Sequence, residues 1–292
     1  MSKLLLILFV FLTTTLFSQK ESKLIYNLKK EDTYIVTADI NSLSIQEIEG
    51  NTQNISTTQS IIYKLKVTET HPGGYDFFVK FEKISTTVNR AGEKRFYNSD
   101  STNNGVSKMF KTFLDKKLNF YISKRGVVTP VYNIDSLFRN ESDAEHKFVF
   151  SQSVEQKITE ILPFPVIFSE KTISGNKWTV SDTTQSGIFR FYDKTFNIDS
   201  TKSNNIFITE KSNISTDKNL PVPMNNVYIY FDLTGNFTGN YIINPETFII
   251  NKGTTVQKAS GEVNMKYTES SYTADSWIIK IENTVNIKCL KI

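Results

Sequence analysis

The sequence predicts a mainly β protein, built as a large twisted antiparallel sheet or half-barrel meander with two short helices. The first observation is composition, because 22 Phe and 13 Tyr residues accompany many Ile, Val and Thr residues, and such side chains suit a pleated, half-buried surface. The second is a regular alternation of apolar and polar residues in neighbouring segments. The third is the series of Gly, Asn, Asp and Pro breaks between segments, which favours a meander.

The clearest strand pair lies in the first third of the chain. Two alternating runs flank a break at residues 71–74, and their apolar members are Ile61, Tyr63, Leu65, Val67, Tyr75, Phe77, Val79 and Phe81. The residues between them are mostly charged or polar. This pattern predicts an antiparallel hairpin with one buried face and one solvent-exposed face.

The flanking segments extend this sheet. Thr33–Ile48 is a candidate long strand, and residues 44–58 are polar enough to contain its turn. Ala91 and Gly92 mark a further turn. Residues 96–104 are rich in Asn, Ser, Thr and Asp, which predicts a loop.

Two helices are expected in the middle of the chain. The first is indicated by apolar residues at spacings of three and four, namely Val106, Met109, Phe110, Phe113 and Leu114. A second hairpin over residues 118–132, with its turn at 124–126, should follow directly. The second helix is suggested by Val154, Ile158, Ile161 and Leu162, and should stop at Pro163 and Pro165.

From Lys177 onward the pattern is almost entirely that of strands. Eight runs are expected, at residues 178–180, 188–192, 205–210, 227–231, 237–243, 248–251, 262–267 and 276–287. Residues 163–177 are the candidate boundary between two packed sub-sheets of one β-rich domain.

The first 18 residues have the three parts of a signal peptide. Lys3 provides the positive charge, residues 4–12 are apolar, and residues 13–18 are small or weakly polar. Cleavage between Ser18 and Gln19 is expected to leave residues 19–292 as a single domain in the periplasm, at the cell surface or outside the cell. The apolar run is too short for a bilayer, which needs about 20 residues, and no cysteine stands at the cleavage point for lipidation.

The charge distribution and the cysteine content indicate which partners and cross-links are not expected. The formal charge of +4 comes from 34 basic and 30 acidic residues that are interspersed along the chain, so no nucleic-acid partner is expected. Cys289 is the single cysteine, which excludes an internal disulfide. It alternates with Val285 and Ile287, and this favours a buried small hydrophobe over a reactive thiol.

The motifs of catalysis and cofactor binding are missing from the sequence. Only His71 and His146 could act as imidazole bases or ligands, and neither accompanies a nucleophile motif or a zinc-ligand spacing. No phosphate-binding glycine loop occurs. The densest acidic cluster, Glu141, Asp143 and Glu145, is best interpreted as a solvated surface, and residues 193–199 lack the spacing of a calcium loop. We therefore predict no catalytic residue, metal or cofactor.

Aromatic residues in the second half of the chain allow two interpretations. They are Trp178, Phe189, Phe191, Tyr192, Tyr228, Tyr230 and Phe231. They could line a cavity for a lipid or stack on sugar rings, or they could fill an ordinary core through cross-strand packing. The second interpretation is the more common one.

Several segments together resemble an uncharacterised family of secreted Bacteroidota proteins, known as a domain of unknown function. The resemblance lies in residues 96–100, 118–128, 162–165, 175–178, 239–243, 245–250 and 261. The strand order is also similar in outline to the half-barrels of periplasmic lipoprotein carriers. This likeness implies a curved sheet around helices that can hold acyl chains, although this chain lacks a lipidation cysteine.

The sequence leads to one expected function and two alternatives. The expected function is that of an exported, non-enzymatic envelope protein that binds a lipid or another hydrophobic ligand. The alternatives are a structural or adhesive surface module and a glycan hydrolase that uses paired carboxylates. Neither the ligand-binding residues nor the oligomeric state is indicated.

Overall fold

The computed structural model describes most of the chain between residue 24 and the C-terminus. The described residues are 24–101, 105–114, 116–129, 161–168, 176–180, 184–186, 188–224, 227–267 and 273–292. The predicted cleavage point at Ser18 and Gln19, the acidic cluster at residues 141–145, and His146 lie outside these ranges.

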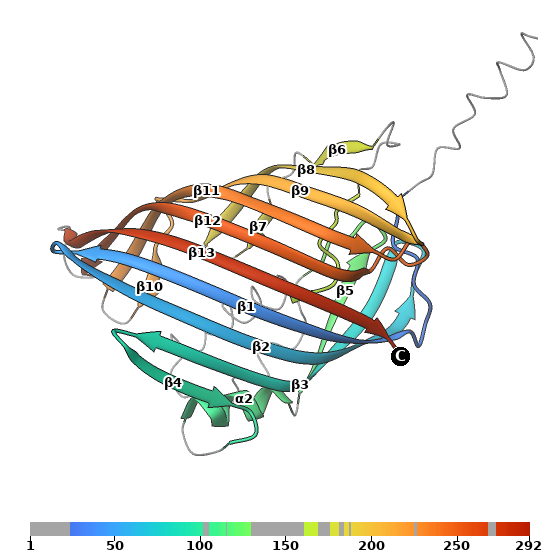
Figure 1. The fold of residues 1–292 in the computed structure, drawn as a ribbon, viewed down its shortest axis with the longest axis horizontal. Coiled ribbons are helices and arrows are strands. Elements are labelled where there is room, and N and C mark those ends of the chain that lie inside the picture. The colour runs from blue at the N-terminus through green and yellow to red at the C-terminus, as the bar shows by residue number, and fades with distance from the viewer. Residues whose placement is uncertain are drawn as a thin grey trace, which may run out of the picture.

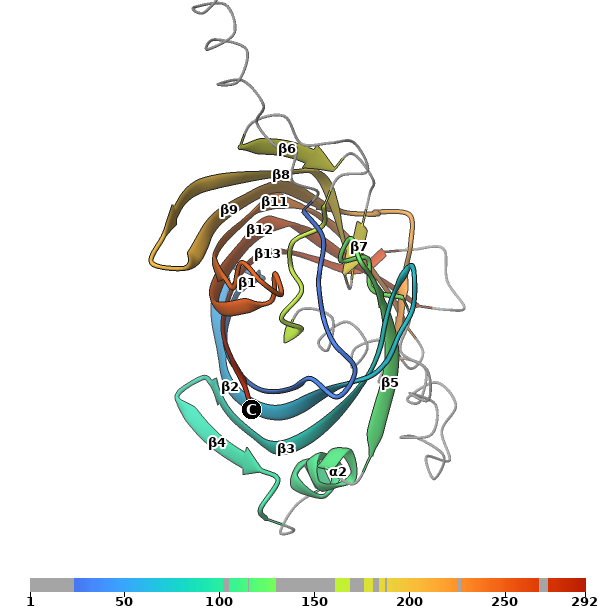
Figure 2. The same cartoon turned by 90° about the vertical axis from the view of Figure 1, so that its right-hand side faces the viewer.

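The described residues form one antiparallel sheet of 13 strands, which curves around an apolar interior (Figures 1 and 2). The predicted fold class is confirmed. The strands are β1 (Thr33–Ile48), β2 (Asn51–Thr70), β3 (Gly74–Arg90), β4 (Glu93–Asn98), β5 (Lys117–Ser123), β6 (Lys177–Val180), β7 (Thr184–Ser186), β8 (Phe189–Lys202), β9 (Asn205–Thr216), β10 (Val222–Met224), β11 (Val227–Ile243), β12 (Ile250–Tyr267) and β13 (Thr273–Lys291).

The strand order is that of a meander with one long-range pairing. The main path runs β4-β3-β2-β1-β13-β12-β11-β9-β8-β6, while β5, β7 and β10 pair with β3, β8 and β11. The first strand therefore pairs with the last, from Tyr34 opposite Lys291 to Glu47 opposite Ile278. Because the path ends at β4 and β6, the described sheet does not close on itself.

The N-terminal hairpins follow the sequence prediction. β1 has the predicted bounds, and its turn contains Glu49 and Gly50, both at positive φ (49° and 78°), as a two-residue hairpin turn requires. The β2–β3 turn lies at residues 71–73, where the His71 amide donates to the Gly74 carbonyl at 2.8 Å. The β3–β4 turn contains Ala91 and Gly92, also at positive φ.

Two sequence expectations about strands were wrong. Residues 96–98 belong to β4, which pairs with residues 85–90 of β3, because a short, polar edge strand has the composition of a loop. The expected runs at 227–231 and 237–243 form one strand, β11, and most of 248–267 forms β12. Gly235 and Gly261 fall in breaks between the expected runs but lie inside these strands, where an added Cβ would overlap backbone atoms of the neighbouring strand.

One helix, α2 (Gly105–Leu114), is present among the described residues. Its predicted apolar stripe is confirmed by the buried Phe110 and Phe113, and the Phe113 ring meets the Phe81 ring edge-on at 6.3 Å. The second expected helix falls mostly outside the described ranges. No described helix has the length and apolar character needed to cross a membrane.

One end of the curved sheet is filled by two chain segments (Figure 2). Residues 24–28 and 161–168 lie against its inner face, and buried hydroxyls fix them. Tyr26 donates to the Val166 carbonyl at 3.1 Å, Tyr63 to the Ile161 carbonyl at 2.6 Å, and Tyr75 to the Tyr26 carbonyl at 2.6 Å. The indole of Trp178 donates to the Ile167 carbonyl at 2.9 Å.

Replacing Tyr63 with Phe should destabilise the fold through this filled end. The change removes only the hydroxyl and leaves the Ile161 carbonyl buried without that donor, so we expect a loss of about 1–3 kcal/mol in the free energy of unfolding. Urea unfolding measures it. Tyr267→Phe is the control, because that side chain is 53% exposed and its change should stay within about 0.5 kcal/mol. Equal effects of the two variants would contradict the proposed anchoring.

Candidate functional site

The inner face of the sheet carries two separate apolar clusters. The larger, here called the main core, surrounds residues 24–28 and 161–168 and includes the fully buried Tyr63, Phe77 and Phe196. The smaller, here called the second apolar patch, consists of Phe189, Phe191, Ile214, Leu233, Ala259, Val263 and Ile279. Its margin is formed by Ile188, Ile229, Phe231, Phe237, Trp277 and Ile281, all of which keep partial exposure. The second patch is thus less completely covered than the main core.

Between the two clusters, polar residues occupy inward positions on β3, β2, β1, β13, β12 and β9, while β11, which lies between β12 and β9, contributes Phe237 and Gly239 to the same rows. The pairing registers place them in two adjacent cross-strand rows, which we call the polar belt: Ser42, Thr57, Gln59, Thr86, Glu210, Ser212, Thr255, Gln257 and Asn283. In one row, Ser42 pairs with Asn283 and Asn283 pairs with Gln257. Successive inward residues along β13 are Ile281, Asn283 and Val285, so the belt interrupts an apolar stripe.

Glu210 is the one buried acidic residue among the described part of the chain, with 2% exposure. The Tyr241 hydroxyl donates to its Oε2 at 2.6 Å, and the Lys194 Nζ lies 3.9 Å from its Oε1. The Lys194 ammonium also lies 4.8 Å from the centroid of the Phe191 ring in the second apolar patch. This cluster therefore joins the belt to the patch.

Two glycines make room for Tyr241. Gly239 pairs with Glu210, and an added Cβ there would overlap the Tyr241 ring and hydroxyl. Gly253 is the cross-strand partner of Tyr241 on β12, and its Cβ position lies 3.0 Å from the Tyr241 Cδ1. The phenol thus lies over two positions without side chains and reaches the carboxyl from the next row.

Burial changes the protonation of this cluster. Desolvation raises the pKa of Glu210, partly opposed by Lys194 and by the Tyr241 hydrogen bond. Desolvation also lowers the pKa of Lys194, partly opposed by Glu210, and raises the pKa of Tyr241 well above 10. Charged forms are disfavoured at both members of the pair, because a separation of 3.9 Å gives only partial compensation for lost hydration.

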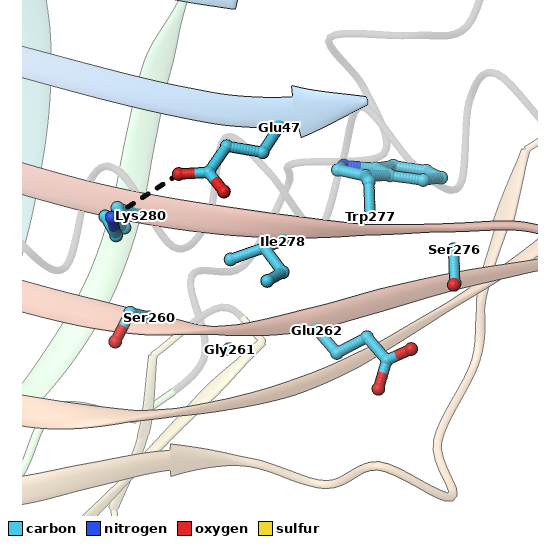
Figure 3. Close-up of a pocket in the computed structure, with 8 residues that line it drawn as sticks. All are labelled: Glu47, Ser260, Gly261, Glu262, Ser276, Trp277, Ile278 and Lys280. Carbon is cyan, nitrogen blue, oxygen red and sulfur yellow. Dashed lines mark ion pairs between the residues drawn. The ribbon is translucent and has the colours of Figure 1, made fainter. Parts of the chain in front are cut away.

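The outer face has a shallow hollow of about 590 Å³, whose lining includes Trp277 (Figure 3). Ile278, which is 49% exposed, lies on β13 near an ion pair between Lys280 and Glu47 at 3.5 Å. Glu262 borders the same hollow. Its charged side chains are largely exposed, so it lacks the enclosure and the buried polar groups that characterise small-molecule sites.

The structure separates the aromatic residues that the sequence grouped together. Trp178 belongs to the main core, and Phe189, Phe191 and Phe231 belong to the second apolar patch or its margin. Tyr228 and Tyr230 point to the outer face, where Lys266 lies 4.9 Å from the centroid of the Tyr230 ring. Cys289 packs partly buried against the main core, and burial raises the pKa of its thiol to about 12.

Sequence reasoning missed Glu210, Tyr241 and Gln257. A signal for Glu210 existed, because Ile206, Ile208 and Ile214 alternate as inward residues of β9 and place the carboxyl among them. His71 lies in the exposed β2–β3 turn, 2.7 Å from the Asp76 carboxylate. No group of three or more His, Cys, Asp or Glu residues within the described ranges could hold a metal.

A curved, open antiparallel sheet around an apolar interior defines the architectural class, and lipovitellin shares this fold. A lipovitellin structure that addresses lipid–protein interactions matches 90% of this chain with a TM-score of 0.55 and 11% identity. This chain corresponds to 25% of the lipovitellin chain, about a quarter of its length.

The chain belongs to a family of unknown function, DUF6263, whose sequence profile matches residues 72–250. The predicted resemblance to a domain of unknown function is confirmed in this respect. No curated protein matches the chain.

Two further solved structures are similar only at low scores. The outer membrane protein OprG from Pseudomonas aeruginosa has a TM-score of 0.29 and 6% identity, over 89% of this chain and 95% of that chain. A DUF1329 family protein from Desulfovibrio piger has a TM-score of 0.16 and 7% identity, over 89% and 86%. Scores this low define neither fold nor function.

Replacing Gly239 with Ala should displace Tyr241 from Glu210. The added methyl overlaps the Tyr241 ring, so we expect a loss of about 1–3 kcal/mol in the free energy of unfolding, as for other overpacked interiors. Chemical denaturation provides the measurement. Gly105→Ala serves as control, since a methyl at that position meets no atom within 4 Å. If Gly239→Ala left the free energy of unfolding unchanged, the Tyr241 ring would be able to adopt another position without cost.

Replacing Glu210 with Gln should change how stability depends on pH. The folded carboxyl has a raised pKa, so it keeps a proton that the unfolded chain releases above its ordinary value of 4.5. Wild-type stability therefore falls as the pH rises from about 4.5 through the raised pKa. The variant lacks this dependence but keeps an acceptor for Tyr241.

We expect the wild type to lose stability relative to Glu210→Gln as the pH rises above about 4.5, as measured by urea unfolding at each pH. Lys194 is present in both proteins, so most of its own contribution cancels. A difference that does not vary with pH would mean that Glu210 titrates normally in the folded state.

Proposed function

We propose that this protein is an exported, non-enzymatic envelope protein that binds a lipid or another hydrophobic ligand against the inner face of its sheet. The observation that carries this proposal is the second apolar patch with its partly exposed aromatic margin. An apolar wall with a few polar groups beside it is the usual composition of a ligand site.

Two further observations support the proposal. The fold is similar to that of lipovitellin, a protein whose structure has been described for its lipid–protein interactions. The proposed export and the location in the periplasm or at the cell surface rest on the signal-peptide pattern of residues 1–18. A purely structural module would need neither the patch margin nor the polar belt beside it.

Native mass spectrometry of the protein, purified gently from its own host, should show a stoichiometric hydrophobic adduct. Lipid extraction then identifies the class of ligand, and the protein mass should correspond to a chain that begins at Gln19. A clean apo mass would contradict tight binding of a hydrophobic ligand and favour a structural module.

The two tryptophans allow the ligand to be located. Trp178 lies in the main core and Trp277 at the margin of the second patch, and the sequence contains no others. In Trp178→Phe, a lipid with brominated acyl chains should quench the fluorescence of the remaining Trp277. In the matched variant Trp277→Phe, Trp178 should keep its emission. Quenching of Trp178 alone would place the ligand beside the main core and not beside the second apolar patch.

A further inference from the structure

The inner face contains a concentration of buried polar atoms without partners. Six such side-chain atoms occur among the described residues, and five of them face inward: Ser44 Oγ, Thr86 Oγ1, Glu210 Oε1, Gln257 Nε2 and Trp277 Nε1. Thr86, Glu210 and Gln257 belong to the polar belt, and Ser44 stands one inward position from Ser42. Trp277 lies at the far margin of the second apolar patch.

These atoms are unusual because folded proteins pair nearly all of their buried polar groups. Gln257 is 8% exposed; its Oε1 accepts from the Asn283 amide at 3.4 Å, while its Nε2 has no acceptor. The Glu210 carboxyl uses Oε2 for Tyr241 and leaves Oε1 without a hydrogen-bond donor. Gln257 and Glu210 stand in adjacent rows only two strands apart, so one bound molecule can supply both missing partners.

The chemistry of the unpaired atoms restricts that molecule. Gln257 Nε2 can only donate a hydrogen bond, so the ligand must offer an acceptor oxygen. Glu210 Oε1 accepts when the carboxyl is ionised and donates when it carries the proton, and the Ser44 and Thr86 hydroxyls can do either. A ligand that satisfies Gln257 and Glu210 carries an acceptor and a donor, as an ester carbonyl beside a hydroxyl does.

The charge balance around Glu210 on the inner face favours an uncharged ligand. Lys194 and Glu210 lie 3.9 Å apart, and the pair leaves no net charge to balance a ligand ion whether both groups are charged or both are neutral. A buried, unbalanced charge is strongly unfavourable. A fatty-acid carboxylate would also meet the Glu210 carboxyl beside the same lysine.

We propose that the polar belt binds the ester and hydroxyl groups of an uncharged lipid of the acylglycerol class, with the acyl chains against the second apolar patch. This inference rests on the proposed function, since it names the ligand class of the same surface. Asn283 in the belt and Trp277 are six residues apart on β13, which places about 20 Å of apolar wall between them.

The test measures quenching of Trp277 in the Trp178→Phe protein by three probes with brominated chains of equal length: a diacylglycerol, a free fatty acid and an alkane. We expect the diacylglycerol to bind at least tenfold more tightly than either of the others. Adding Gln257→Leu should lower the affinity for the diacylglycerol about tenfold and leave the affinity for the alkane unchanged.

Asn264→Leu is the matched control, because Asn264 lies on the same strand and pairs with Ser276 on the outer face. It should not alter binding of any probe. Circular dichroism and thermal unfolding establish that each variant is folded, and the preference among probes tests the inference even if Gln257→Leu does not fold.

The outcomes separate the inference from the proposed function. If the three probes bind equally, or the fatty acid binds best, the acylglycerol assignment is overturned while hydrophobic binding stands. If no probe quenches Trp277 and no lipid co-purifies, the proposed function fails as well. Diacylglycerol preference that Gln257→Leu abolishes and Asn264→Leu preserves supports both.

Discussion

The sheet contributes to the interior of this protein through one face only, so each strand provides alternate residues to it. This constraint explains why the apolar residues of β2 and β3 alternate so regularly, and why every inward polar residue stands out. At one end, residues 24–28 and 161–168 complete the interior through buried tyrosine hydroxyls. At the other end, the second apolar patch has a margin that remains partly exposed.

The polar belt conflicts with the apolar pattern on either side of it, and such conflicts between local composition and burial commonly mark functional sites. Gln257, Glu210 and Ser212 are buried although their strands could have continued with Val or Ile at these positions. Gly239 and Gly253 are part of the same arrangement, because only positions without side chains accommodate the Tyr241 ring over the sheet. The carboxyl, the phenol and the two glycines therefore form one structural unit that spans β9, β11 and β12.

The sequence was sufficient for the fold class and for the local hairpins, because alternation and turn chemistry are properties of neighbouring residues. The β1 strand, the β2–β3 hairpin and the apolar stripe of α2 could all be predicted on this basis. Cross-strand contacts cannot be read from the sequence, which is why Gly235 and Gly261 fall in breaks between the expected runs although two backbones approach closely there. The candidate site could not be predicted for the same reason: Ser42, Asn283 and Gln257 become neighbours only through the register of three strands.

The pairing of the first strand with the last has a consequence for the order in which the protein can fold. A chain that emerges from its N-terminus presents β1 long before β13 exists, and until then one edge of β1 has no partner. Exposed strand edges invite pairing with other chains, and contacts between distant residues form slowly. The β1–β2–β3 hairpins can form early, but the curved sheet that carries the belt becomes continuous only when β13 pairs with both β1 and β12. Loss of β13 would leave two separate sheets with open edges at the centre of the molecule.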